Sequence, residues 1–261
     1  RPVMKGMKFM KDGQMHTVEG EMSEKDKASM DKIQRVLEKI LPYKEVRSLV
    51  LLILASGLSG WPIEKFFIFN GAGRNGKGFL NEFMMWCLGD YAVHVSPAIL
   101  TELKRFQSSS APNPEKAKLH KKRFVVTSEP AKHQKINNDT MKDLTGGGET
   151  QARMLHSSET RVLLYLTFLM ECNEKPQLNE EPTQADAERI LDCLFPSLFT
   201  SKEEMCDEGK LIFPQDPSLK SKEWKDQHKN AFMSILIKHL LILKNAKYNI
   251  DSFVPESVKK R

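Results

Sequence analysis

Residues 66–78 read FFIFNGAGRNGKG, a short apolar run that leads directly into a glycine-rich loop. An unbroken apolar run that ends at turn residues is typical of a central parallel strand covered on both faces. The loop has the spacing of a glycine, four residues, a second glycine and a lysine. Its members are Gly71, Ala72, Gly73, Arg74, Asn75, Gly76, Lys77 and Gly78. The stretch predicts a strand, a phosphate-binding loop and a helix that begins near Lys77.

The loop has the chemistry needed to bind ATP. Glycines let backbone N–H groups turn inward around phosphate oxygens, and the following helix N-terminus adds partial positive charge. Lys77 is placed to reach the β- and γ-phosphates. Gly78 departs from the pattern, which has Ser or Thr there to put a hydroxyl on Mg²⁺. Either water fills that ligand position or metal affinity is reduced. A glycine-rich turn without a ligand is the alternative, which the strand before and the helix after disfavour.

Outward from the loop, strand-like and helix-like segments alternate along the chain. Helices are predicted over 27–40 (with Ser23 as a cap), 44–56, 77–88, 138–144, 185–192 and 222–243, and strands over 91–95, 123–128 and 162–170. Such alternation predicts an α/β fold with a parallel sheet flanked by helices. We expect a lead-in and helical subdomain over 1–60, the core over 61–205, a C-terminal helical segment over 206–261, and a loose tail beyond Asp251.

A carboxylate for the same site is predicted at the end of the strand over 123–128. Ligands collect at the carboxyl edge of doubly wound sheets, where Glu129 follows Ser128. Glu129 is the candidate for holding Mg²⁺ or activating the attacking water, and Ser128 for touching Mg²⁺ or its water. The alternative is a glutamate that only ends a strand beside Pro130.

Two further side chains are candidates for the catalytic set. Asn173 follows the apolar strand that ends near Met170, where an amide could orient water; by itself it also suits a residue that opens a turn. Arg189 lies shortly after and could stabilise transition-state charge in a neighbouring subunit, or be an ordinary surface charge.

Composition limits the alternatives only loosely. The net charge of +6 and pI near 9.0 permit a nucleic-acid partner without requiring one. The cysteines are Cys87, Cys172, Cys193 and Cys206. They form no CxxC pair, which argues against a structural zinc site. The apolar run 49–58 is too short to span a bilayer, so we expect no membrane partner. A start at Arg1-Pro2 predicts a segment of a longer protein.

The order GAGRNGKG, KKRFVVTSEP, MKDLTGGGETQARMLH, LMECNEKP and DAERI resembles the superfamily 3 helicases, especially the poxvirus-type primase-helicases of large DNA viruses. The resemblance covers roughly residues 61–200. It implies an AAA+-like ATPase that uses ATP and Mg²⁺, forms a hexameric ring on single-stranded or forked DNA, moves 3′ to 5′, and shares its parent chain with a primase domain. It also implies an intracellular site of viral replication, in the host cytoplasm or nucleus.

The resemblance assigns roles to individual residues. Lys77 matches the loop lysine, Glu129 the acidic Walker B residue, Asn173 the sensor, and Arg189 the finger region, where Glu188 stands in place of a second arginine. Residues 146–161 resemble a hairpin that projects into the central channel. Its basic side chains suit a phosphate backbone, with Lys142 a weaker candidate. The DNA-binding candidates are Arg153, His156, Arg161 and Lys142.

Two other functions stay open on the sequence. A small-molecule P-loop phosphotransferase accounts for the loop but not for the basic hairpin. A non-catalytic or weakly hydrolysing, nucleotide-dependent DNA-binding or assembly module is compatible with Gly78 and a lone Glu129.

Overall fold

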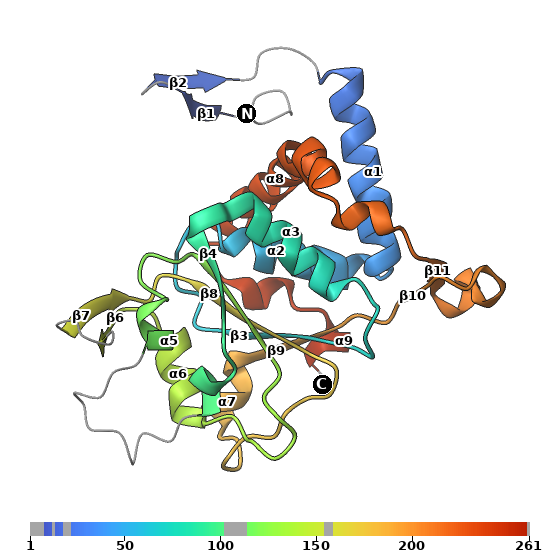
Figure 1. Cartoon of the computed structure of the whole chain (residues 1–261). Coiled ribbons are helices and arrows are strands. Elements are labelled where there is room, and N and C mark those ends of the chain that lie inside the picture. The colour runs from blue at the N-terminus through green and yellow to red at the C-terminus, as the bar shows by residue number, and fades with distance from the viewer. Residues whose placement is uncertain (1–7, 12–13, 18–21, 102–113, 154–158, 260–261) are drawn as a thin grey trace.

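The computed structural model describes residues 8–11, 14–17, 22–101, 114–153 and 159–259. A five-stranded sheet with the order β4-β5-β8-β3-β9 forms its centre (Figure 1). The strands are β3 (Phe66–Asn70), β4 (Ala92–Val95), β5 (Phe124–Ser128), β8 (Thr167–Cys172) and β9 (Ile190–Leu194). All neighbours in this sheet pair in parallel, so their carboxyl ends meet at one edge. The predicted α/β fold, an AAA+-like parallel sheet flanked by helices, is confirmed.

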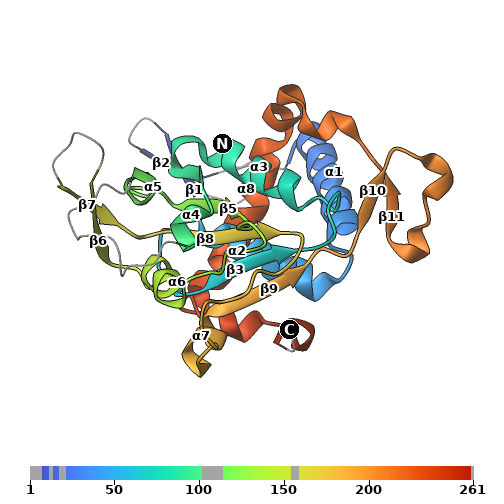
Figure 2. The same cartoon turned by 60° about the horizontal axis from the view of Figure 1, so that its bottom comes forward.

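Helices cover both faces of the sheet, as Figure 2 shows. The helices are α1 (Glu24–Ile40), α2 (Lys44–Ser56), α3 (Lys77–Leu88), α4 (Ala98–Thr101), α5 (Pro114–Ala117), α6 (Asn138–Thr145), α7 (Gln184–Arg189), α8 (Lys222–Asn245) and α9 (Glu256–Lys259). Alternate side chains of β3 enter two separate cores. Phe67 and Phe69 pack with α1, α2, α3 and α8, whereas Phe66 and Ile68 pack with α4 and α6. Burial on both faces explains why β3 is apolar without alternation.

Short strand pairs and single turns lie outside the central sheet. The antiparallel pairs are β1 (Lys8–Lys11) with β2 (Gln14–Thr17) and β6 (Glu149–Arg153) with β7 (Glu159–Leu163), and the parallel pair is β10 (Leu198–Thr200) with β11 (Ile212–Pro214). The 3₁₀ turns are η1 (Gly89–Tyr91), η3 (Glu203–Met205), η4 (Glu208–Lys210), η5 (Pro217–Lys220) and η6 (Ile250–Phe253).

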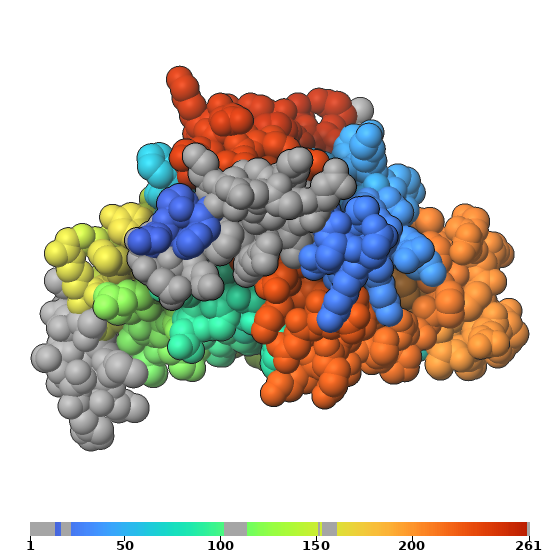
Figure 3. Space-filling view, turned by 90° about the horizontal axis from the view of Figure 1, so that it is seen from above, coloured from blue at the N-terminus to red at the C-terminus, as the bar shows by residue number. Residues whose placement is uncertain are grey.

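The C-terminal helix α8 packs against the loop-bearing helix α3. The Phe232 ring stacks on the Phe83 ring with centroids 4.6 Å apart. Figure 3 shows α1 (blue) between the start of α8 (red-orange) and the β10–β11 region (orange). Ser197 also donates its hydroxyl to the backbone carbonyl of Lys39 at the end of α1. Elements from both ends of the chain therefore meet beside the loop.

Several local predictions are confirmed and three are wrong. Ser23 caps α1 by accepting the backbone N–H of Asp26. The predicted helix over 185–192 ends at Arg189, since residues from Ile190 pair with β3. The predicted strand over 162–170 is two strands, β7 and β8. The tail beyond Asp251 is packed rather than loose, with Val254 and Val258 buried.

Candidate functional site

The glycine-rich loop joins β3 to α3 in a conformation that requires its glycines. Gly71 has φ +146°, and a Cβ there would lie 2.4 Å from Asn75 Nδ2 and 2.5 Å from the carbonyl oxygen of Phe195. Gly76 has φ +87°, and a Cβ there would meet Ile40 at 2.6 Å. Larger side chains would therefore clash with the loop's own support, as well as being strained in the backbone.

Asn75 anchors the loop from inside. Its buried side chain donates to the carbonyl of Phe195 at 3.3 Å and accepts the backbone N–H of Lys77 at 3.3 Å. The loop is thereby tied to the segment that follows β9. This anchor depends on a contact between residues 120 positions apart.

Lys77 lies at the centre of the site, where its ammonium group bridges two strand ends. The side chain donates to the carbonyl of Gly71 at 2.8 Å and to Asn173 Oδ1 at 2.7 Å. Only 8% of the residue is exposed. Burial lowers the pKa of Lys77, and the negative charge of Glu171 is the strongest influence in the opposite direction. Lys77 and Asn173, which were predicted separately, thus meet directly.

Glu129 lies beside Asn173 and holds the turn that carries it. Glu129 Oε2 accepts the backbone N–H groups of Asn173 at 2.6 Å and of Glu174 at 3.1 Å. Ser128 lines the same cavity, and its Oγ lies 3.4 Å from His94 Nε2. The carboxylate predicted for water activation therefore also fixes the position of Asn173.

Glu171 is a site residue that the sequence reasoning missed. It lies near the end of β8, opposite Phe69 of β3 and Ser128 of β5. Its Oε2 accepts a hydrogen bond from Asn81 Nδ2 at 3.0 Å. The available signal was an acidic side chain ending an otherwise apolar strand, but its significance depends on β8 lying next to the loop strand.

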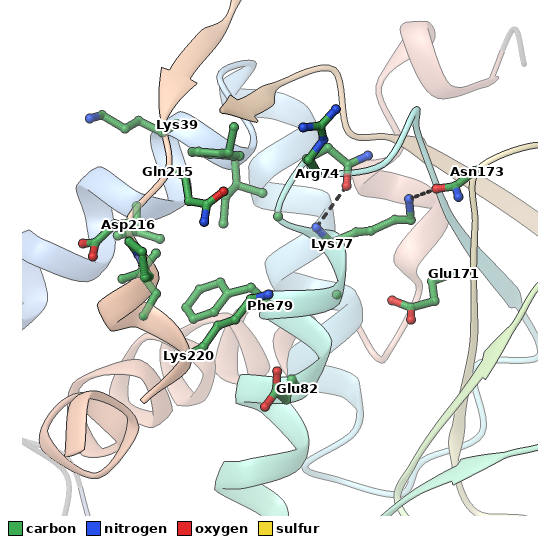
Figure 4. A pocket seen from close by; sticks show the side chains of 18 of the residues that line it. Lys39, Arg74, Lys77, Phe79, Glu82, Glu171, Asn173, Gln215, Asp216 and Lys220 are labelled. Atoms are coloured by element: carbon green, nitrogen blue, oxygen red, sulfur yellow. Dashed lines mark hydrogen bonds between the residues drawn. The ribbon is translucent and has the colours of Figure 1, made fainter. Parts of the chain in front are cut away.

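A cavity of about 740 Å³ opens from the loop. Its lining includes Glu129, Glu171 and Asn173 at the sheet edge, and Val36, Lys39 and Ile40 from α1. Residues between 199 and 220 contain no recognised motif, yet they form another wall of the cavity with Phe199, Gln215 and Leu219. Figure 4 shows Lys77 between Asn173 on one side and Gln215 on the other. The volume is in the range of small-molecule and cofactor sites.

The other predicted side chains lie outside this cavity. Arg189 forms an ion pair with Glu64 at 3.2 Å, and Lys142 lies 3.4 Å from both Asp186 and Asp139. The contact with the buried Asp186 joins α6 to α7. Both cations are therefore paired with acidic side chains of the same chain.

The predicted basic hairpin is present as the β6–β7 pair. Arg153 pairs with Glu159 in the backbone register, and Arg161 forms an ion pair with Glu149 across the two strands. His156 lies outside the described residues. The hairpin surface therefore carries the exposed cation of Arg161, which is paired with the carboxylate of Glu149.

The carboxylates that line the cavity suit a hard cation, such as Mg²⁺ bound to a nucleotide. No group of three or more His, Cys, Asp or Glu side chains is placed to hold a metal within the described ranges. Mg²⁺ commonly takes one or two carboxylates and completes its shell with phosphate oxygens and water. Glu171 and Glu129, which line the cavity beside the glycine-rich loop, fit that requirement. Among the described residues, no helix has the length and apolar character to cross a membrane.

No protein-family model matches the chain. Curated viral proteins do match it. A candidate helicase of Acanthamoeba polyphaga mimivirus is 33% identical over 225 residues, 83% of this chain and 23% of that protein. A candidate helicase of Frog virus 3 is 28% identical over 204 residues, 75% of this chain and 20% of that protein. A primase of fowlpox virus is 28% identical over 200 residues, 74% of this chain and 24% of that protein.

The chain thus spans less than a quarter of the length of these relatives. Among solved structures, the apo C-terminal region of NrS-1 matches with a TM-score of 0.56 and 14% identity. That match covers 95% of this chain and 59% of the other, and concerns the fold. By its relatives and its fold, the chain belongs to the superfamily 3-type family of viral primase-helicases.

Proposed function

We propose that the chain is the ATPase part of a viral replicative primase-helicase and drives movement along single-stranded DNA. The observation that carries the proposal is the direct contact of Lys77 Nζ with Asn173 Oδ1 at 2.7 Å, beside Glu129 and the loop. Lysine, sensor amide and acidic side chain converge at the carboxyl edge of a parallel sheet. That is where a triphosphate and its attacking water would lie.

The cavity supports ATP as the nucleotide. Phosphates would bind the loop amides and Lys77, which would exchange its contact with Gly71 for phosphate oxygens. A flat base would lie between α1 and the 199–220 segment, near Ile40 and Phe199. Mg²⁺, when bound, would neutralise phosphate charge. Glu129 would orient or deprotonate the attacking water, and Asn173 would respond to the γ-phosphate.

A ring of subunits, with the DNA backbone contacted by Arg153, His156 and Arg161, completes the proposal. It is supported by the family and by the position of the β6–β7 pair outside the sheet. Arg189 would serve a neighbouring site only after leaving Glu64, so its finger role depends on the subunit interface. A primase domain elsewhere in the parent chain and an intracellular site of viral replication belong to the same proposal.

The test is ATP hydrolysis with Mg²⁺, with and without single-stranded DNA, and with the oligomeric mass recorded on the same sample. We expect DNA to stimulate turnover by a ring-sized species. Turnover that ignores DNA would favour a small-molecule phosphotransferase. Nucleotide binding without turnover in a ring-sized species would favour the assembly module.

A further inference from the structure

Gly78 leaves space in the proposed phosphate site, although its backbone conformation does not require a glycine. The residue lies in the first turn of α3, and its φ is not among the positive values in the chain. A Cβ at this position would lie 3.8 Å from Glu171 Oε2, an ordinary van der Waals distance. A serine side chain could therefore be accommodated here, and it would approach the Glu171 carboxylate.

Glu171 comes from the strand next to the loop strand and is held in place by a buried amide. Asn81, one turn along α3, is 3% exposed and donates to Glu171 Oε2 at 3.0 Å. Asn81 Oδ1 is buried and has no hydrogen-bond partner within the described part of the chain. Burying an amide oxygen without a hydrogen-bond partner costs free energy. Because Asn81 nevertheless keeps its Nδ2 group directed at Glu171, its side chain points to a role in positioning that carboxylate.

From this juxtaposition we propose that Glu171 supplies a carboxylate ligand to the cation of the metal–nucleotide complex. It takes the role that a hydroxyl at position 78 would otherwise have, and Asn81 positions it. The proposal rests on the proposed function, because the cation arrives with the nucleotide. Carboxylate oxygens are preferred Mg²⁺ ligands.

Replacing a neutral hydroxyl with a charged carboxylate changes how the site depends on the metal. Without the cation, the Glu171 charge repels the triphosphate and opposes the attraction of Lys77. With the cation bound, the same charge is attractive. Glu171→Gln should therefore leave the affinity for metal-free ATP unchanged or higher, and lower the affinity in Mg²⁺. A structural role alone would lower both affinities together.

The experiment is equilibrium titration with a fluorescent ATP analogue in EDTA and in Mg²⁺, with Mn²⁺ affinity of the protein–nucleotide complex measured by electron paramagnetic resonance. For Glu171→Gln we expect the ratio of the two nucleotide affinities and the Mn²⁺ affinity to fall by about 10- to 100-fold. Glu174→Gln is the matched control, because that side chain is 79% exposed and pairs with Lys132. It should keep both values.

A second variant protects the test against misfolding. Adding Gly78→Ser to Glu171→Gln should restore part of the Mn²⁺ affinity by supplying the missing hydroxyl, and both proteins should keep the wild-type melting temperature. Equal losses in EDTA and Mg²⁺, or an unchanged Mn²⁺ affinity, would overturn the role of Glu171. Failure of the wild-type protein to bind the analogue in either buffer would instead overturn the proposed function.

Discussion

Glu129 supports the Asn173 turn and is proposed to activate the attacking water, and two substitutions separate these two roles. Its Oε2 accepts the amides of Asn173 and Glu174, while its charge is available to activate water. Glu129→Gln keeps an acceptor oxygen but removes the charge. Glu129→Ala removes both. We therefore expect both variants to lose turnover by roughly 10²- to 10⁴-fold, the usual contribution of a general base.

ATP affinity should distinguish the two variants. Each lost hydrogen bond contributes about 0.5–1.5 kcal/mol, so Glu129→Ala gives up roughly 1–3 kcal/mol of support for the Asn173 turn. If ATP binds only the supported turn, this loss weakens its affinity by about 5- to 150-fold. In Glu129→Gln the affinity should stay within about threefold, since an acceptor remains.

The assays are steady-state ATP hydrolysis and equilibrium titration with a fluorescent ATP analogue, performed on the same preparations. Glu174→Gln is the control, because it changes a nearby charge but leaves the Glu174 backbone amide in place. Equal ATP affinities for Glu129→Gln and Glu129→Ala would refute the idea that the Glu129 hydrogen bonds hold the Asn173 turn for ATP binding. Wild-type turnover in Glu129→Gln would refute the role in water activation.

Three other predictions concern Lys77 and the packing beneath it. Lys77→Ala should abolish hydrolysis and weaken ATP binding by roughly 10- to 150-fold, since a charged hydrogen bond contributes about 1.5–3 kcal/mol; retained turnover would exclude the site. Burial lowers the pKa of Lys77 from 10.5, so its ammonium is present below the lowered pKa and is lost as pH rises through it. As the pH is raised, the affinity for metal-free ATP should therefore begin to fall at a lower pH in wild type than in Lys77→Arg. Affinity-against-pH curves that coincide for the two proteins would contradict this. Phe232→Ala should lower the free energy of unfolding by about 3–5 kcal/mol in urea denaturation, whereas Leu241→Ala, 52% exposed on the same helix, should change it by less than about 0.5 kcal/mol. A loss below about 1 kcal/mol at Phe232 would mean that α8 does not support α3.

The parts of the fold that follow from neighbouring residues were accessible from the sequence. The apolar run before Gly71 and the loop spacing place β3 and the start of α3. Other elements are decided by distant partners. Residues from Ile190 continue an apolar helical pattern, yet they form β9 because they pair with β3. Local periodicity cannot anticipate such a pairing.

The residues of the candidate site also fall into two groups: those that a local motif marks and those that only the strand order brings together. Lys77 and Glu129 follow from motif spacing and strand ends. Glu171 became recognisable only when the strand order placed β8 between β5 and β3. The 199–220 wall of the cavity carries no motif, because apolar and amide side chains define a pocket only through the surfaces they face. The roles assigned to the candidate site residues stay predictions: Lys77, Ser128, Glu129 and Asn173 at the cavity, and Arg153, His156, Arg161, Lys142 and Arg189 outside it.

Strand β8 has a mechanical consequence for any coupling between nucleotide and DNA. Its carboxyl end carries Asn173, and residues 164–166 join its other end to β7 of the hairpin. Because β8 is hydrogen-bonded along both sides, to β5 and to β3, it cannot slide lengthwise without breaking two ladders at once. Leu164 and Leu166 are buried, which stiffens the joint. We therefore expect the hairpin and the central sheet to move together as one rigid body. In the proposed ring, a nucleotide-driven movement of the hairpin would then come from tilting of whole subunits against one another.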